Sequence, residues 1–178
     1  MPVEKYIAQT KNWVQTVIIG LNFCPFARWE FDRGTIRFSI LKGSIEHCLE
    51  SLILECDLLE ADKTVETTLL ILPEGFEKFD YFLYLLDLAN DLLADQGYEG
   101  IYQLASFHPD YCFAGVPAED PANYTNRSPY PMLHLLREES LDKALEHHPD
   151  PEGIPLRNIE LARAMGEDKL KNLRAACF

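Results

Sequence analysis

The sequence predicts an α/β fold: a single layered domain over residues 1–178, with a small, mostly parallel sheet of three to four strands and flanking helices. Two observations carry this prediction. Up to Phe107, segments with the apolar period of a helix alternate with segments that have the period or the length of a strand. Each strand segment is separated from the next by a helix segment, which is typical of parallel strands joined by right-handed crossovers. We further expect about residues 139–178 to form a helical C-terminal extension packed on this domain.

The first elements follow from apolar spacing. Apolar residues from Pro2 to the region of Gly20 recur at three- and four-residue intervals, which predicts an amphipathic helix. Pro25 disfavours helix at the residue before it, so residues 22–26 break this helix. Residues 35–41 alternate between apolar and polar and predict a half-buried strand. Ser44 is a favourable N-cap for a second helix over residues 45–59.

Two more strands and a third helix are expected next. Residues 67–72 form a short, almost wholly apolar run, typical of a central strand buried on both faces. A third helix over residues 79–93 should stop at Gly97. Residues 100–107 predict a third strand, and residues 111–116 a short edge strand.

A long connection, Ser106–Glu138, follows the third strand and is rich in proline and asparagine. Within it, residues 131–138 predict one or two helical turns. Loops of this length inside a compact domain are often functional. Three further helices are expected after it: a short one capped by Ser140, one over residues 156–165 and one over residues 167–176.

Composition narrows the classes of partner. Lysine and arginine number 16 against 29 aspartate and glutamate, giving a net charge of −13. An acidic protein of this kind repels nucleic acid and anionic membranes, so neither is an expected partner. The five cysteines are odd in number and lack a C-x-x-C pair, which predicts free thiols in a reducing cytoplasm. The N-terminal residues lack the order of a signal peptide, and no run reaches the ~18 apolar residues of a membrane span.

His108 is singled out by its position directly after the third predicted strand. Ligands collect beyond the carboxyl ends of parallel strands, so a histidine there could act as a general base or bind substrate. The alternative is a structural histidine that bonds to the loop backbone.

The segment around His134 offers a second histidine. His134, Arg137 and Glu138 have the spacing of one helix face, which resembles half of a metal-binding helix. The absence of tight ligand spacing elsewhere argues against a metal. Three residues could complete such a site if the fold brought them close: His108, Asp110 and Cys24.

A polar cluster, Asn126 to Ser128, precedes Tyr130 in the same loop. Arginine binds carboxylates and phosphates through paired N–H groups, so Arg127 predicts an anionic small molecule as partner. Ser128 could cap a following helix whose N–H groups would face that anion. Alternatively, Arg127 holds the loop closed by pairing with one of its acids: Asp110, Glu119 or Asp120.

Cys24 lies just past the first predicted helix. A helix C-terminus raises the pKa of a thiol, so a nucleophilic Cys24 would need His108 or an arginine beside it. A buried, unreactive thiol is the alternative.

Three long motifs resemble a bacterial family, the domain-of-unknown-function 1415 family: GLNFCPFA over residues 20–27, YQLASFHPDYCFAG over residues 102–115, and NRSPYPMLHLLRE over residues 126–138. The resemblance covers almost the whole chain and implies no established activity. The motif positions that it marks are Asn22, Cys24, Pro25, Phe26, His108, Pro109, Asn126, Arg127, Ser128, Pro129, Tyr130, His134 and Arg137.

Our first hypothesis is a small cytoplasmic enzyme acting on an anionic small molecule. The catalytic candidates are His108, His134 and Cys24, and the substrate-binding candidates are Asn126, Arg127, Ser128, Tyr130 and Arg137. No metal is assigned, and the cofactor and oligomeric state stay open. The alternatives are a noncatalytic module that binds a metal or metabolite, and a protein-interaction module that uses the loop over residues 106–138.

Overall fold

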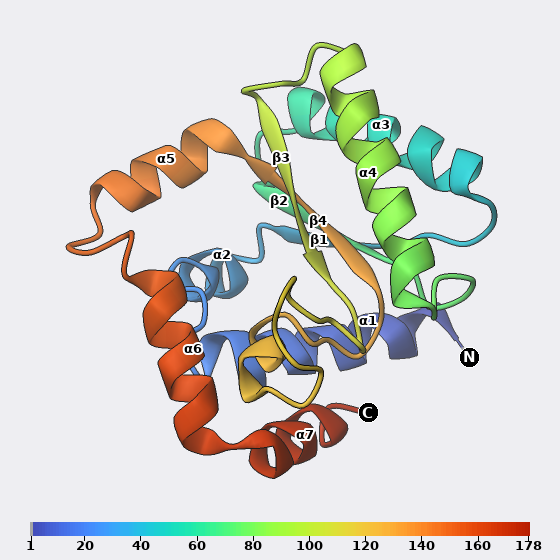
Figure 1. The fold of residues 1–178 in the computed structure, drawn as a ribbon. Helices are drawn as coiled ribbons and strands as arrows, with labels where there is room; N and C mark the ends of the chain where they lie inside the picture. Colours follow the sequence, from blue (N-terminus) through green and yellow to red (C-terminus); the bar gives the residue numbers. More distant parts are fainter. Residues whose placement is uncertain (1) are drawn as a thin grey trace.

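The computed structural model describes residues 2–178 and has a mixed four-stranded sheet flanked by helices (Figure 1). The strands β1 (Ile36–Ile40), β2 (Thr67–Ile71), β4 (Met132–Arg137) and β3 (Tyr102–Phe107) lie side by side in that order. β1 and β2 pair in parallel, whereas β4 runs antiparallel to both β2 and β3. The α/β class is confirmed, but the expectation of a mostly parallel sheet is wrong, because two of the three pairings are antiparallel.

The fourth strand replaces the helical turns that we expected over residues 131–138. Its side chains alternate between the two faces of the sheet, and both faces are covered by protein. A strand covered on both faces reads as a nearly continuous apolar run, so its sequence does not show the alternation that separates strand from helix. The edge strand expected over residues 111–116 is also wrong, because the backbone there forms turns.

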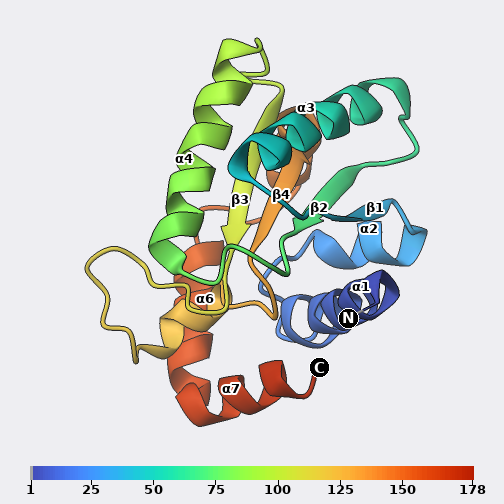
Figure 2. The ribbon, with the colours of Figure 1, turned by 90° about the vertical axis from the view of Figure 1, so that its right-hand side faces the viewer.

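One face of the sheet, which we call the α3–α4 face, is covered by α3 (Ile45–Ala61) and α4 (Phe79–Asp95). Figure 2 shows these two helices together on one side of the strands. Ser44 caps α3 as expected, since its side chain accepts a hydrogen bond from the His47 N–H. In α4, Phe82, Leu85 and Ala89 have no accessible surface. Helix and sheet therefore meet here in a continuous core.

The opposite face, which we call the α1–α6 face, is covered by the other helices. α1 (Val3–Trp13) continues directly into a π-helical segment, η1 (Val14–Ile19), so the first expected helix is present with a wider final part. α2 (Ala27–Arg33) was not expected. The remaining elements on this side are a 3-10 segment η2 (Pro121–Thr125), α5 (Glu138–Glu146), α6 (Ile154–Met165) and α7 (Glu167–Ala175).

The three C-terminal helices confirm the expected elements, although Ser140 lies inside α5 rather than capping it. No helix within residues 2–178 is long and apolar enough to cross a membrane.

Candidate functional site

Side chains on the α1–α6 face of the sheet lie in rows that cross the strands. His134 sits in the middle row, between Leu69 on β2 and Ala105 on β3. Next to it, Met132 and Phe107 share a row that Trp13 covers, with the Trp13 and Phe107 rings 5.2 Å apart. The small side chain of Ala105 leaves space beside the histidine. The sheet face is therefore packed at one end and open at the other.

A cavity of about 470 Å³ occupies the open end, and we call it the chamber. Its floor includes Thr67, His134 and Ala105, and its walls come from η1, α2, α5 and α6. Most of the lining is apolar, with Ile18, Phe23, Phe113, Leu141 and Ile159 among the wall residues. Small-molecule sites are commonly of this size and mainly apolar, with a few placed polar groups.

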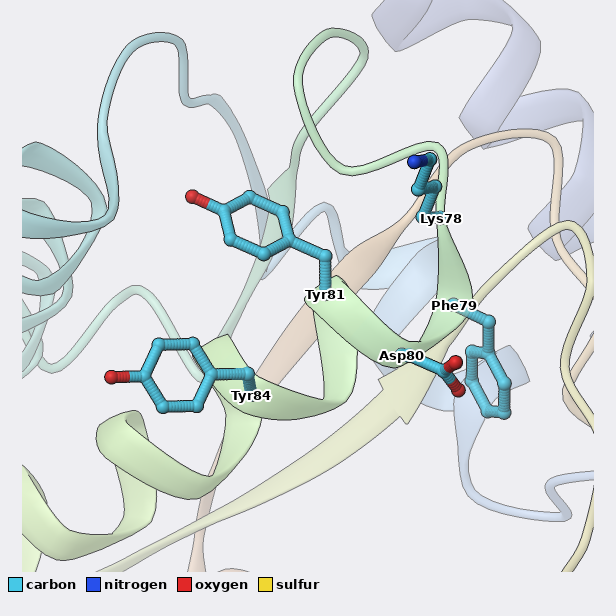
Figure 3. A pocket seen from close by; sticks show the side chains of 5 residues that line it. All are labelled: Lys78, Phe79, Asp80, Tyr81 and Tyr84. Atoms are coloured by element: carbon cyan, nitrogen blue, oxygen red, sulfur yellow. The ribbon is translucent and has the colours of Figure 1, made fainter.

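A second hollow lies on the outer surface of α4, where Tyr81 and Tyr84 project away from Phe79 and Asp80 (Figure 3). Tyr81 and Tyr84 are 45% and 55% exposed, so this hollow is an open surface rather than an enclosed site. None of the eight candidate residues from the sequence lines it. The chamber is therefore the stronger candidate.

His134 is the principal polar group on the chamber floor. Its Nε2 lies 2.8 Å from the Thr67 hydroxyl, and that hydroxyl donates to the Leu135 carbonyl at 2.6 Å. The side chain is half-buried at the base of the chamber, and burial lowers the pKa of His134 to about 4. The imidazole is consequently neutral near pH 7.

Cys24 is placed in the chamber wall by the way the backbone ends the helix η1. Asn22 has a left-handed backbone with φ of 54°, and the N–H groups of Asn22 and Phe23 bond back to carbonyls of η1. This is a left-handed helix cap, in which asparagine is tolerated next after glycine. Asn158 on α6 donates to the Phe23 carbonyl at 2.6 Å, which fixes the segment that carries Cys24.

The Cys24 thiol experiences two opposing influences. Burial is the larger and raises its pKa, while the backbone N–H groups of Phe26 and Ala27 lower it. These N–H groups belong to the start of α2, a helix that the sequence did not predict. The segment before Cys24 by itself predicts a raised thiol pKa, and only the structure shows the opposing N–H groups at the start of α2.

Asn126 joins Cys24 and His134 in the lining of the chamber. Its side-chain amide donates to the Ser106 carbonyl at 3.1 Å and accepts from the Thr125 hydroxyl at 3.1 Å. With Arg137, which also lines it, the structure brings together four of the eight candidate residues in one cavity.

His108 lies on the other face of the sheet, packed against Phe79 and Phe82 of α4. It has no accessible surface, its Nε2 lies 3.0 Å from the Phe76 carbonyl, and its Nδ1 accepts from the Asp110 N–H at 2.9 Å. Both ring nitrogens are therefore engaged with backbone. The loops after β2 and β3 do meet here, but the contact matches the structural alternative.

Arg127 holds the long loop together through backbone carbonyls. Its Nε donates to the Tyr111 carbonyl at 3.0 Å and its Nη2 to the Ala118 carbonyl at 2.7 Å. The guanidinium also lies over the Tyr124 ring. The loop is closed as in our alternative interpretation, although none of its acids is the partner.

Ser128 and Tyr130 are likewise occupied within the loop and its neighbours. The Ser128 hydroxyl donates to the Tyr130 carbonyl at 2.6 Å, so it does not cap a helix. The Tyr130 hydroxyl bonds to Gln9 on α1.

Arg137 borders the chamber, but its guanidinium turns to the α3–α4 side. It donates to the carbonyls of Leu59 and Val65 and to the Tyr102 hydroxyl. Residues i and i+3 of a strand point to opposite faces, so His134 and Arg137 do not share a face as the helical spacing implied. Within residues 2–178 there is also no group of three or more His, Cys, Asp or Glu side chains placed to hold a metal.

Sequence reasoning missed Thr67 and Asn158. Thr67 fixes the His134 ring from a neighbouring strand, and Asn158 fixes the Cys24 segment from a helix far along the chain. Neither lies in a motif, and only the strand register and the packing of α6 show their roles.

Comparison with known proteins gives one family. The model of a family described as "Protein of unknown function (DUF1415)" matches residues 5–172. No curated protein and no solved structure matches the chain.

Proposed function

We propose that this chain, which belongs to the DUF1415 family of proteins of unknown function, binds a small and largely apolar molecule in the chamber. The observation that carries the proposal is the cavity of about 470 Å³ above His134, lined mainly by apolar side chains. An apolar molecule that enters it loses contact with water, which is favourable in proportion to the area buried.

The charges around the chamber support an apolar ligand over the anionic one that we expected from the sequence. The guanidinium groups of Arg127 and Arg137 are bonded to backbone carbonyls. Two carboxylates, Glu30 and Glu66, are part of the lining. Arg137, the arginine of the lining, is already bonded to carbonyls, so an anion placed here would meet Glu66 and Glu30. Of these two carboxylates, Glu30 is paired with Arg33 at 3.9 Å.

Docking of a protein on the long loop has less support. That alternative requires exposed aromatic side chains, but Tyr124 is buried, and Tyr111, Phe113 and Tyr130 are half-buried. We also propose a cytoplasmic location, which the five free cysteines support because unpaired thiols persist in reducing compartments.

The direct test is native mass spectrometry of freshly purified protein, compared with the denatured mass. We expect an added mass in the native spectrum that disappears on denaturation. Ala105→Phe should fill the space beside His134 and remove the added mass, whereas Ala94→Phe, at an exposed position on α4, should leave it.

A ligand lost during purification requires a supplied probe. Isothermal titration with para-butylphenol should show saturable binding to the wild type and to Ala94→Phe, with none to Ala105→Phe. If the three folded proteins behave alike in both measurements, the chamber is not the binding site.

A second candidate function is catalysis by Cys24 on the bound molecule. The observation that favours it is that a thiol and a neutral histidine line the same chamber, next to the N–H groups of Phe26 and Ala27. An activated ester, para-nitrophenyl butyrate, would test it: the thiol loses its proton to solvent, the sulfur attacks the carbonyl, para-nitrophenolate leaves and a butyryl thioester remains. Acylation of Cys24 should exceed that of the half-buried Cys112; equal or slower reaction at Cys24 counts against catalysis.

A further inference from the structure

We propose that the ligand of the chamber is a neutral molecule that carries a hydroxyl or N–H group, and that His134 Nδ1 accepts its hydrogen bond. This inference rests on the proposed function and names the chemical class of the ligand. It follows from the hydrogen-bond roles around one ring and from the charges of the wall.

The first step assigns the proton of the Thr67 hydroxyl. Its oxygen lies 2.6 Å from the Leu135 carbonyl oxygen and 2.8 Å from His134 Nε2. A carbonyl only accepts hydrogen bonds, so the single hydroxyl proton must point to Leu135. The hydroxyl oxygen is then an acceptor toward the ring, and Nε2 carries the hydrogen that it accepts.

The second step assigns the other nitrogen. A neutral imidazole has one N–H donor and one acceptor nitrogen, and Nε2 holds the hydrogen here. His134 Nδ1 is therefore an acceptor with a free lone pair. Burial of the ring, which lowers its pKa to about 4, keeps it in this neutral form.

The third step concerns the direction that Nδ1 faces. Within residues 2–178 no protein group donates a hydrogen bond to it, and no fully enclosed side-chain nitrogen or oxygen lacks a partner. Nδ1 therefore retains accessible surface, and the cavity that His134 lines is the chamber. Its neighbours in the row, Leu69 and Ala105, have apolar side chains that cannot donate.

An unpaired acceptor in an apolar site selects among ligands. A ligand that donates to Nδ1 satisfies it, whereas an equally large ligand without a donor leaves it unpaired and desolvated. Sites that hydrogen-bond a hydroxyl group reject analogues lacking it far more strongly than apolar pockets reject a change of size. An anion and a cation would each lose hydration against a mainly apolar wall, and the anion would also meet Glu66 and Glu30, the latter paired with Arg33.

Matched probes test the donor directly. para-Butylphenol and para-butylanisole share one apolar body, but methylation removes the hydroxyl donor of the second, and para-butylbenzoate supplies the anion. By isothermal titration near neutral pH, the phenol should bind the wild type about tenfold or more tighter than the anisole, because an unsatisfied acceptor costs about 1–3 kcal/mol. The benzoate should bind most weakly.

Variants assign the preference to His134. His134→Leu should bring the phenol-to-anisole ratio close to one while retaining anisole binding, and His147→Leu, at an exposed position, should keep the wild-type ratio. Should His134→Leu not fold, imidazole ¹⁵N spectra of the wild type give an independent measurement: Nδ1 should show the unprotonated shift and move on addition of phenol.

The outcomes separate the two proposals. Equal affinity for phenol and anisole, with saturable binding of both, overturns the donor inference and leaves the apolar chamber standing. Tighter binding of benzoate overturns the neutral character of the ligand. A protonated Nδ1 in the ¹⁵N spectra contradicts the assigned tautomer, and no binding of any probe removes the proposed function itself.

Discussion

The two faces of the sheet differ in how their helices meet it. On the α3–α4 face, Phe82, Leu85 and Ala89 of α4 have no accessible surface. On the α1–α6 face, every residue of α5 is half-buried or exposed, although its Leu141 and Ala144 line the chamber. A helix whose side chains are fully buried contributes more to stability than a helix whose side chains stay half-buried or exposed. The comparison teaches that one sheet can carry a close-packed core on one face and a cavity on the other.

Alternate side chains of the central strand β4 point to opposite faces of the sheet. Leu133 and Leu135 point into the α3–α4 core, while His134 and Leu136 line the chamber. Shifting its register by one residue would exchange these sets, burying the histidine in the core. Alternate residues of β4 thus contribute to the packed core on one face and to the chamber on the other.

The largest expected loss of stability comes from a substitution on the packed α3–α4 face. Leu85→Ala removes a fully buried side chain and should lower the free energy of unfolding by about 2–5 kcal/mol. Leu141→Ala on α5 is the matched change over the chamber and should cost less than about 1 kcal/mol. Urea unfolding of both variants measures the contrast. Equal losses would mean that α5 is packed as firmly as α4.

A medium effect is expected from Arg137, which the sequence assigned to the substrate. Arg137→Met leaves the carbonyls of Leu59 and Val65 without this donor, so the free energy of unfolding should fall by about 1–3 kcal/mol. Arg163→Met, which removes a partly exposed ion pair with Asp120, should cost about 1 kcal/mol or less. Ligand affinity should stay unchanged in Arg137→Met; a loss of affinity without a loss of stability would restore its role in binding.

The effect that is smallest near neutral pH concerns His134 on the chamber floor. The pKa of His134 is about 4 in the folded protein, against an ordinary value of 6.5. The unfolded chain takes up a proton first as pH falls, so this contribution is complete above pH 6.5 and is lost as pH falls toward 4. The full window corresponds to about 3 kcal/mol, of which about 1–2 kcal/mol is lost by about pH 5.

The measurement compares unfolding free energies of the wild type and His134→Leu at several pH values. The difference between them should shrink as pH falls through the window, because only the wild type carries this histidine. His108, whose pKa is also lowered mainly by burial, contributes in the same direction to both proteins and cancels. A difference that is constant with pH would show that the ring is not held neutral.

The sequence predicted the elements whose apolar period is clear. β1, β2, α3 and α4 lie where their patterns placed them, because each buries one defined stripe or run. It failed where burial hides the period: β4 is covered on both faces, so its residues looked like helical turns. α2 was missed because none of its residues is buried, which leaves no apolar stripe to detect.

The residues of the candidate site were predicted only in part, because their contacts depend on the tertiary structure. Cys24, Asn126 and His134 do line one chamber, as their shared chemistry suggested. His108 was assigned by the rule for parallel strands, and it lies on the opposite face, where backbone groups hold both nitrogens. Arg127 and Arg137 have the chemistry to bind anions, but only the folded backbone shows that carbonyls already occupy them.

The order of the strands also bears on how the chain acquires its fold on the ribosome. β4 is the last strand to be synthesised, yet it lies between β2 and β3. β3 therefore leaves the exit tunnel with no neighbour to pair with and waits until residues 132–137 follow. Until then the nascent chain exposes an unpaired edge of β2 and a free β3, the kind of surface that aggregates or recruits chaperones. Completion of the sheet thus waits for residues 132–137, and until they are available the nascent chain is open to aggregation.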